Sequence, residues 1–347
     1  MCRWIAFCGA ADGHPVPLSD VLCKPVNSLL EQAAHAAYHP GFTGKNNAVL
    51  NADGFGCAWY SPDGCAAVFK SVQPAWSDAN LRELSRAVFS RTVFGHVRAA
   101  SPGSLCSHEN THPFRRGRLV FMHNGHVEGG ARVRRAMLAG LSDDIFSGVA
   151  GLTDSEAVFA LVASFLRDPE RAVPFAPAEL AAAMRAAVAA VLAAVARCGV
   201  TGGFTTLNCA LTDGETVVAT RFCDHWPAVP PPSLYFSFAT HAELRVELNA
   251  AKCAAPEAPP AAGAGAAPAA AVTHTAADIS DERWARDRRF LDAAAATANE
   301  RTLVVASEPA TEGNSVAWLA VPAQAMLVFT RGSGRPPELT QLLLPAE

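Results

Sequence analysis

The sequence predicts an α+β fold in which antiparallel sheets are flanked by helices. Two pairs of short apolar runs are separated by the tight-turn sequences Ser61-Pro-Asp-Gly64 and Thr212-Asp-Gly214, which are typical of β-hairpins. The other expected strands and helices come in blocks and do not alternate one by one along the chain. Hairpins and blocks favour antiparallel sheets with helices packed outside them over a doubly wound parallel sheet.

The first half is predicted to begin with a buried strand, Cys2–Gly9, which is apolar and ends at glycine. Leucine and alanine recur at helical spacing over 25–37, and Leu81–Phe89 is predicted to form a second helix with Asp78 or Asn80 as its N-cap. The further strands expected in this half are Gly56–Tyr60, Ala66–Phe69, Thr92–Ala100 and Arg118–Met122.

Helices dominate the middle of the chain. One is expected over 132–141, and another begins after Thr153, where Glu156 would complete a capping box. A long alanine-rich helix is predicted over Pro177–Arg197, closed by Gly199. The strands expected after it are Phe204–Leu211, Glu215–Phe222, Leu234–Thr240, Arg301–Ser307, Ala317–Val321 and Ala325–Thr330.

Composition excludes several functional classes. The 347 residues are 50% hydrophobic and 17% charged, with a formal net charge of -4, so no basic surface for nucleic acid or acidic lipid is expected. No uninterrupted apolar run reaches the roughly 18 residues of a membrane span, and no signal peptide is recognised. The ten cysteines form no CxxC pair, so no zinc site is predicted, and no cofactor is expected. The thiols are expected to be reduced, in a cytoplasmic protein.

Cys2 is a candidate nucleophile because of its position directly after the initiator methionine. Removal of Met1 would place a thiol and a free α-amine on the same residue. An α-amine titrates at about 7.7–8.0, so it can accept the thiol proton near neutral pH and return it later. This is the chemistry of N-terminal nucleophile hydrolases. The alternative is that Cys2 is an ordinary core residue of a strand.

Three polar motifs at the ends of expected elements could cooperate with Cys2. Arg98 ends one strand, Asn124-Gly125 ends another and Asp154 begins a helix. A guanidinium suits a carboxylate, an acidic side chain suits an ammonium, and amide N–H groups suit a developing oxyanion. Each motif also has a structural alternative, namely an ion pair for Arg98, a turn for Asn124-Gly125 and a helix cap for Asp154.

Taken together, these motifs resemble the glutaminase domain of class II glutamine amidotransferases, in order and in spacing. The matching segments are Met1-Cys2-Arg3, Asn51-Ala-Asp-Gly-Phe-Gly56, His96-Val-Arg-Ala-Ala-Ser101, His112-Pro-Phe114, His123-Asn-Gly125 and Thr153-Asp-Ser-Glu156. The resemblance implies an N-terminal nucleophile hydrolase fold, a four-layer αββα sandwich. It implies that Cys2 attacks a γ-glutamyl amide, with Asn124 and Gly125 as the oxyanion hole. Substrate would be bound by Arg98, Asp154, Ser101 and His112.

Within this family the flanking sequence is most similar to the fungal glutathione-degrading amidotransferase-like subunit, up to about Thr330. The resemblance implies hydrolysis of the γ-glutamyl bond of glutathione or a related compound, with a peptidase-like protein partner. A glutaminase or an ergothioneine-pathway γ-glutamyl hydrolase is an alternative with the same chemistry. A non-catalytic scaffold for a peptidase is an alternative of another class.

The domain organisation expected from this resemblance has four parts. Residues 2–250 form the amidotransferase-type domain, and strands in 278–330 complete it. Between them, 251–277 are rich in alanine, proline and glycine and are expected to be a disordered insertion, because they carry few side chains able to form a core. Residues 331–347 are expected to be a loose tail.

Overall fold

The computed structural model describes residues 1–35, 50–101, 103–240, 243, 295–311 and 317–342. Two large sheets dominate it, and every strand pair in them is antiparallel. The first sheet has seven strands in the order β13-β11-β12-β1-β6-β3-β4, and the second has six in the order β15-β14-β10-β9-β8-β7. A two-stranded ribbon pairs β2 with β5. The predicted α+β class is confirmed.

The strand bounds follow. The first sheet consists of β1 (Arg3–Cys8), β3 (Phe55–Tyr60), β4 (Ala66–Ser71), β6 (Thr92–Val97), β11 (Tyr235–Thr240), β12 (Arg301–Ala306) and β13 (Leu319–Ala320). The second consists of β7 (Phe114–Arg116), β8 (Leu119–His126), β9 (Thr206–Thr212), β10 (Thr216–Arg221), β14 (Ala325–Thr330) and β15 (Glu338–Gln341). The ribbon is β2 (Val16–Pro17) and β5 (Phe89–Ser90).

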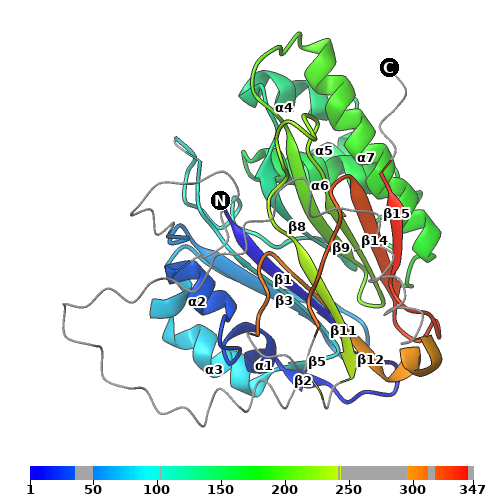
Figure 1. Ribbon diagram of the computed structural model, residues 1–347. Coiled ribbons are helices and arrows are strands. Elements are labelled where there is room, and N and C mark those ends of the chain that lie inside the picture. The colour runs from blue at the N-terminus through cyan, green and yellow to red at the C-terminus, as the bar shows by residue number, and fades with distance from the viewer. Residues whose placement is uncertain (36–49, 102, 241–242, 244–294, 312–316, 343–347) are drawn as a thin grey trace.

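Helices cover the outer face of each sheet, which gives the expected αββα layering (Figure 1). The first sheet carries α1 (Leu18–Leu22), α2 (Leu29–Ala34) and α3 (Ala79–Ala87), with the short turn η1 (Ala75–Ser77). The second carries α4 (Gly130–Leu138), α5 (Asp143–Ser147), α6 (Asp154–Ser164) and α7 (Pro177–Arg197). Another turn, η3 (Ala295–Glu300), precedes β12.

Alternation along the strands divides the core into three hydrophobic clusters. Trp4, Ala6 and Cys8 of β1 face the second sheet, whereas Ile5 and Phe7 face the helices of the first. On β8, Val120 and Met122 face the first sheet, and Leu119 and Phe121 face α4–α7. Because side chains in a strand alternate with a period of two, this parity also fixes which way the later polar residues of each strand point.

Among the described residues, α7 is the one helix long and apolar enough to span a membrane by length and composition. Seven of its residues are buried in the helical layer, where the helix contacts α6, β10 and β14: Leu180, Ala183, Met184, Ala187, Val188, Val191 and Ala194. An apolar face of this kind is what a helix packed on a sheet requires.

Several elements differ from the sequence expectations. The strand expected to end at Met122 continues to His126, because it pairs with β9 from Val120 to His126. Thr153 caps α6 as predicted, but the side chain of Glu156 accepts hydrogen bonds from the N–H groups of Ala150 and Gly151, so the predicted capping box is wrong. Asp78 is the N-cap of α3.

The C-terminal part of the chain contributes strands to both sheets. Strand β12 lies between β1 and β11, and β14 pairs with β10. Glu338–Gln341, expected within a loose tail, instead forms the edge strand β15 beside β14. The segment 251–277, expected to be a disordered insertion, lies outside the described residues.

Candidate active site

The thiol of Cys2 lies just before the first residue of β1, at the edge of the space between the two sheets. Cys2 shares the parity of Trp4, so its side chain points toward the second sheet. The register pairs Arg3 with Val97 of β6, which sets Cys2 beside the residues that follow that strand. The sulfur is 3.4 Å from the backbone nitrogen of Ala99 and 3.6 Å from its carbonyl oxygen.

Burial shapes the ionisation of both groups at this terminus. Burial raises the pKa of the Cys2 thiol, while the hydrogen bond from Ala99 and nearby positive charge act in the opposite direction. Burial lowers the pKa of the terminal ammonium, which here belongs to Met1. Burial at this terminus therefore favours a protonated thiol and a neutral amine.

Arg98 directly follows β6 and is held on both sides. Its backbone N–H donates to Gly54 at 2.8 Å, and its carbonyl accepts from Asp53 at 3.1 Å. The guanidinium, on a residue only 3% exposed, donates to the hydroxyl of Ser104 at 2.7 Å and to the carbonyl of Leu105 at 3.1 Å. Two of five guanidinium N–H groups are thus used in these contacts, which fix its direction and leave donors for a carboxylate.

Asn124 and Gly125 lie inside β8, where they pair with Asn208 and Leu207 of β9. Asn124 is 1% exposed and shares the parity of Met122, so its side chain faces the first sheet. Its Oδ1 has no hydrogen-bond partner among the described residues. A β-carbon at Gly125 would clash with the carbonyl of Thr206 and the imidazole of His123, so the local packing itself requires glycine here.

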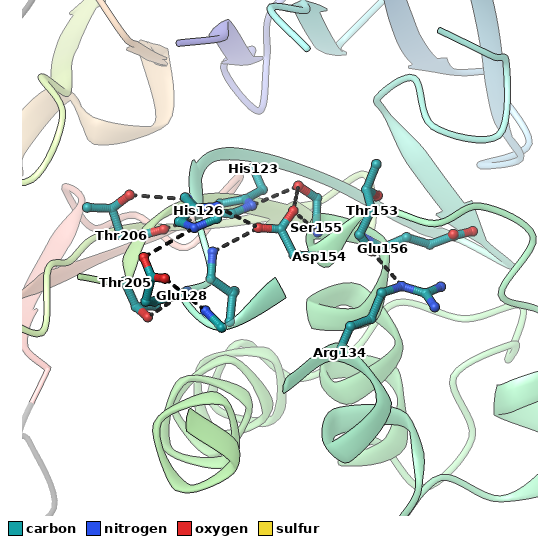
Figure 2. Close-up of polar contacts among 12 residues, drawn as sticks. His123, His126, Glu128, Arg134, Thr153, Asp154, Ser155, Glu156, Thr205 and Thr206 are labelled. Carbon is teal, nitrogen blue, oxygen red and sulfur yellow. Dashed lines mark hydrogen bonds and ion pairs between the residues drawn. The ribbon is translucent and has the colours of Figure 1, made fainter. Parts of the chain in front are cut away.

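Asp154 opens α6 and ties this helix to the end of β8 (Figure 2). Its carboxylate accepts hydrogen bonds from the N–H groups of Val127 and Ser155, each at 2.8 Å. The half-exposed imidazole of His126 lies between two acids, with Nδ1 3.7 Å from Asp154 and Nε2 3.5 Å from Glu128. The Asp154 side chain keeps 28% of its surface exposed, so a cation can still approach it.

A chain of contacts brings these residues to one end of the two sheets. Cys2 contacts Ala99, the residue after Arg98. The indole of Trp4 donates to the carbonyl of Asn208 at 3.2 Å, and Asn208 is the strand partner of Asn124. Asp154 binds the backbone three residues after Asn124. Cys2, Arg98, Asn124 and Asp154 are therefore linked through contacts of their neighbours in the chain or of their strand partners, although their sequence numbers span 2–154.

Three histidines are packed beneath this cluster. The rings of His96 and His112 stack with centroids 4.1 Å apart, and His112 is 3% exposed. His123 Nδ1 is 2.9 Å from the hydroxyl of Ser155 and Nε2 is 3.0 Å from the carbonyl of Thr206. Burial lowers the pKa of His96 to about 3 and that of His112 well below its ordinary value. The role of His112 as a substrate-binding residue stays a prediction.

Acid is expected to destabilise the protein through these rings. Below pH ~6.5 the histidines of the unfolded chain become protonated, while the buried rings of the folded protein stay neutral. The unfolded state therefore binds more protons, and the free energy of unfolding decreases as the pH is lowered. The limiting slope is about 1.4 kcal/mol per pH unit for each such histidine. Urea unfolding at pH 7 and pH 5 should show a smaller loss in His96→Asn than in the wild type or in the control His14→Asn, which alters an exposed ring. Equal losses would contradict this account.

Some residues of the cluster were not predicted from the sequence. Asp53 accepts a hydrogen bond from Ala100 at 2.8 Å, and its charge opposes the loss of the proton from the terminal ammonium. Asn110 joins two loops, donating to Leu105 at 3.0 Å and accepting from Leu152 at 2.8 Å. Asp53 lies in the matching segment Asn51–Gly56, which was the available signal, whereas Asn110 lies just before the segment His112–Phe114. Ser101, a predicted substrate residue, is exposed, and its carbonyl accepts from Ser104.

Neither of two large surface hollows, of about 1370 and 700 Å³, includes Cys2, Arg98 or Asn124 among its lining residues. The first is lined by residues of α4–α7 and nearby loops, and the second lies beside Lys70 and Glu156. Within the described part of the chain, no group of three or more histidine, cysteine and acidic residues is arranged to hold a metal ion.

The chain is similar in sequence to known amidotransferases and hydrolases. A family model for class-II glutamine amidotransferases matches residues 33–254. The probable glutamine amidotransferase DUG3 of Saccharomyces cerevisiae is 36% identical over 167 residues, covering 46% of this chain and 44% of the yeast protein. The gamma-glutamyl-hercynylcysteine sulfoxide hydrolase of Mycolicibacterium smegmatis is 33% identical over 130 residues, covering 38% and 53%. The chain spans about half the length of these two relatives.

Solved structures share the fold at low identity. A glutamine aminotransferase class-II domain protein from Silicibacter pomeroyi matches with a TM-score of 0.58 and 22% identity, over 100% of both chains. The allosteric regulatory enzyme of purine biosynthesis matches with a TM-score of 0.52 and 12% identity, over 99% of this chain and 50% of that one. These likenesses support the sandwich of two antiparallel sheets between helical layers.

Proposed function

The chain belongs to the class-II glutamine amidotransferase family, and we propose that it is an amidohydrolase that cleaves γ-glutamyl amide bonds with Cys2 as its nucleophile. The observation that carries this proposal is the contact between the Cys2 sulfur and the backbone of Ala99, the residue after the buried Arg98, whose positive charge acts on the thiol. Cys8, the last residue of β1, lies fully buried between the sheets, where its polar neighbours are Thr92, Glu215 and Arg331.

The proposed reaction begins when the α-amine of Cys2, exposed by removal of Met1, takes the thiol proton directly or through a water. The sulfur attacks the γ-carbonyl carbon, and the oxyanion that forms is bound by the Asn124 side-chain amide and the Gly125 N–H. Collapse of this intermediate breaks the C–N bond, and the ammonium returns its proton to the leaving amine. Water, deprotonated by the same amine, then hydrolyses the thioester and releases glutamate.

Recognition of the glutamyl group is assigned to two charged residues. Arg98 binds the α-carboxylate with the guanidinium donors left after its contacts to Ser104 and Leu105. Asp154 binds the α-ammonium through its exposed oxygen edge. Ser101 and His112 are further proposed substrate contacts. Stacking on His96 would hold the ring of His112 in place.

The leaving group is proposed to be the cysteinylglycine portion of glutathione or a related amine. Two relatives support a γ-glutamyl substrate, one by its name as a glutamine amidotransferase and the other as a γ-glutamyl-hercynylcysteine sulfoxide hydrolase. Glutathione, glutamine and the sulfoxide share the α-carboxylate, the α-ammonium and the scissile carbonyl. One site can therefore accept all three, and groups beyond the amide would decide the preference.

The test measures glutamate release from glutathione, glutamine and γ-glutamyl-hercynylcysteine sulfoxide, each with and without a peptidase subunit. Mass spectrometry of the intact protein should show loss of Met1. Release by the isolated chain supports a hydrolase. Release only when the peptidase is present, and equally with Cys2→Ala, would replace the proposal by the non-catalytic scaffold. The nine described cysteines are all free, which supports a reducing compartment such as the cytoplasm.

Activity is expected to rise with pH through the pKa of the terminal amine. The amine must be neutral to accept the thiol proton, and an α-amine ordinarily titrates at about 8. Burial lowers the pKa of the Met1 ammonium that precedes Cys2 in the unprocessed chain, and we expect the Cys2 amine, at nearly the same place in the fold, to be lowered as well. Because burial raises the pKa of the thiol, direct ionisation of the sulfur would require a more alkaline solution. A profile of kcat/KM between pH 5 and 9 should have its rising midpoint below 8. A midpoint above 8.5 would indicate that the free thiolate is the reacting species.

A further inference from the structure

A buried ion pair lies directly behind the proposed nucleophile. Arg3 Nε is 2.7 Å from Glu308 Oε1, and the two side chains are 2% and 0% exposed. The partners are 305 residues apart in the sequence. Asn27 supports the same segment, because its side-chain amide donates to the carbonyl of Pro309 at 2.8 Å and lies 3.4 Å from Glu308 Oε2. The guanidinium is therefore held by groups from distant parts of the chain.

The same guanidinium also holds the backbone at Cys2. Arg3 Nη1 donates to the carbonyl of Cys2 at 3.0 Å and to that of Met1 at 3.2 Å. The Cys2 contact does not depend on Met1, so it can persist after Met1 is removed. Arg3 thus links the residue that carries the thiol to a fixed, fully buried carboxylate.

Strand pairing on the β12 side of β1 becomes incomplete toward the terminus, although pairing with β6 continues to Arg3. The register between β1 and β12 begins at Ile5, opposite Ala306. Before Ile5, Ser307 exchanges hydrogen bonds with the backbone of Trp4, at 3.0 Å and 3.1 Å. Glu308 follows Ser307 in the chain, and its carboxylate contacts the side chain of Arg3, the residue before Trp4. Terminal residues fray unless they are tied down, and frayed geometry would misplace both thiol and amine.

We propose that Arg3 and Glu308 are a positioning pair that fixes the Cys2 backbone, and with it the thiol and the α-amine, for attack on substrate. This inference rests on the proposed function of Cys2. Neither residue is assigned a contact with substrate. Stability alone is a weak explanation for the pair, since buried ion pairs can often be replaced by apolar residues of similar volume without loss of stability.

That property provides the test. Glu308→Gln leaves an uncompensated buried charge and should lower both Tm and kcat. The double variant Arg3→Met, Glu308→Leu removes both charges, and its Tm should recover to near the wild-type value. Its kcat should nevertheless stay at least about tenfold below wild type, with KM within about twofold, because the carbonyl of Cys2 has lost its donor. Recovery of kcat together with Tm would overturn the inference, since the pair would then be merely structural.

A second ion pair, near the opposite end of β1 from Cys2, provides a control. Arg331 Nε is 2.9 Å from Glu215 at the other end of the strand, near Cys8. Glu215→Gln should leave kcat and KM near their wild-type values. An equal fall of kcat in this variant would show that loss of any ion pair has the same effect, and would also overturn the inference.

Two measurements separate this inference from the proposed function. Hydrogen exchange of the N-terminal peptide and the rate of Cys2 alkylation by iodoacetamide, read by mass spectrometry of that peptide, do not require turnover. Both should increase in the double variant, while exchange in β9 and α7 stays unchanged. If the wild type hydrolyses no γ-glutamyl compound, the proposed function fails. If exchange at the terminus is unchanged in the double variant, the positioning role fails even in an active enzyme.

Discussion

Cys2→Ala is expected to abolish glutamate release, with kcat reduced by at least about 10³-fold. The variant keeps the strand and the packing of Trp4 but lacks the sulfur that would form the thioester. Cys2→Ser should retain a small residual rate, because a hydroxyl is a weaker nucleophile than a thiol at neutral pH. Initial rates of glutamate release, measured with the substrate that the wild type prefers, are the readout.

Cys8→Ala is the matched control for this variant. Cys8 is the last residue of β1 and points to the same side as Cys2, but its thiol is packed between the sheets, 3.8 Å from the carbonyl of Glu215. We expect the activity of Cys8→Ala to remain within a few-fold of wild type, with some loss of stability from the cavity that the missing sulfur leaves. Turnover that persists in Cys2→Ala, or disappears equally in Cys8→Ala, would exclude Cys2 as the specific nucleophile.

Asn124→Ala is expected to lower kcat by about 10²–10³-fold, the loss typical of one oxyanion-hole donor. The side chain is buried, faces the first sheet and leaves its Oδ1 without a partner among the described residues. The substitution therefore removes no hydrogen bond that a described residue donates to this oxygen. KM should change little, because the oxyanion exists only in the transition state and the intermediates.

Asn208→Ala separates catalysis from stability. Asn208 is the strand partner of Asn124, and its side-chain amide donates to the carbonyl of Pro232 at 2.9 Å. Its loss should lower Tm but leave kcat within several-fold of wild type. If Asn124→Ala changes Tm and kcat only as much as Asn208→Ala does, the assignment of Asn124 to the oxyanion hole would be wrong.

Local sequence signals were sufficient for much of the fold. The turns at Ser61–Gly64 and Thr212–Gly214 join strand pairs β3–β4 and β9–β10 as expected. Apolar periodicity identified the long helix α7, whose bounds, Pro177–Arg197, agree with the prediction. Such elements are long or have strong turn chemistry, so their local preferences agree with their tertiary surroundings.

Tertiary contacts decided the elements that the sequence did not predict. Asn-Gly is a common turn signal, yet Asn124 and Gly125 lie in a strand because β9 pairs with them. Strand β7 and helix α5 are only three and five residues long, too short for a periodic pattern. The edge strand β15 depends on β14 for its backbone partners.

The site shows the same division. The position of Cys2 and the polar residues at element ends could be read from the sequence, and the spacing supported their grouping. Arg3 and Glu308 could not be paired in this way, because no local pattern connects residues 305 positions apart. The stacking of His96 on His112 likewise depends on how a loop returns to the sheet.

The central place of β1, between β6 and β12, has a consequence for biosynthesis. Strand β12, residues 301–306, is translated long after β1. Until it has been made, β1 can pair with β6 alone. The segment around Cys2 therefore gains its second strand neighbour only after translation has passed residue 306, and pairing on both sides of β1 cannot form before then.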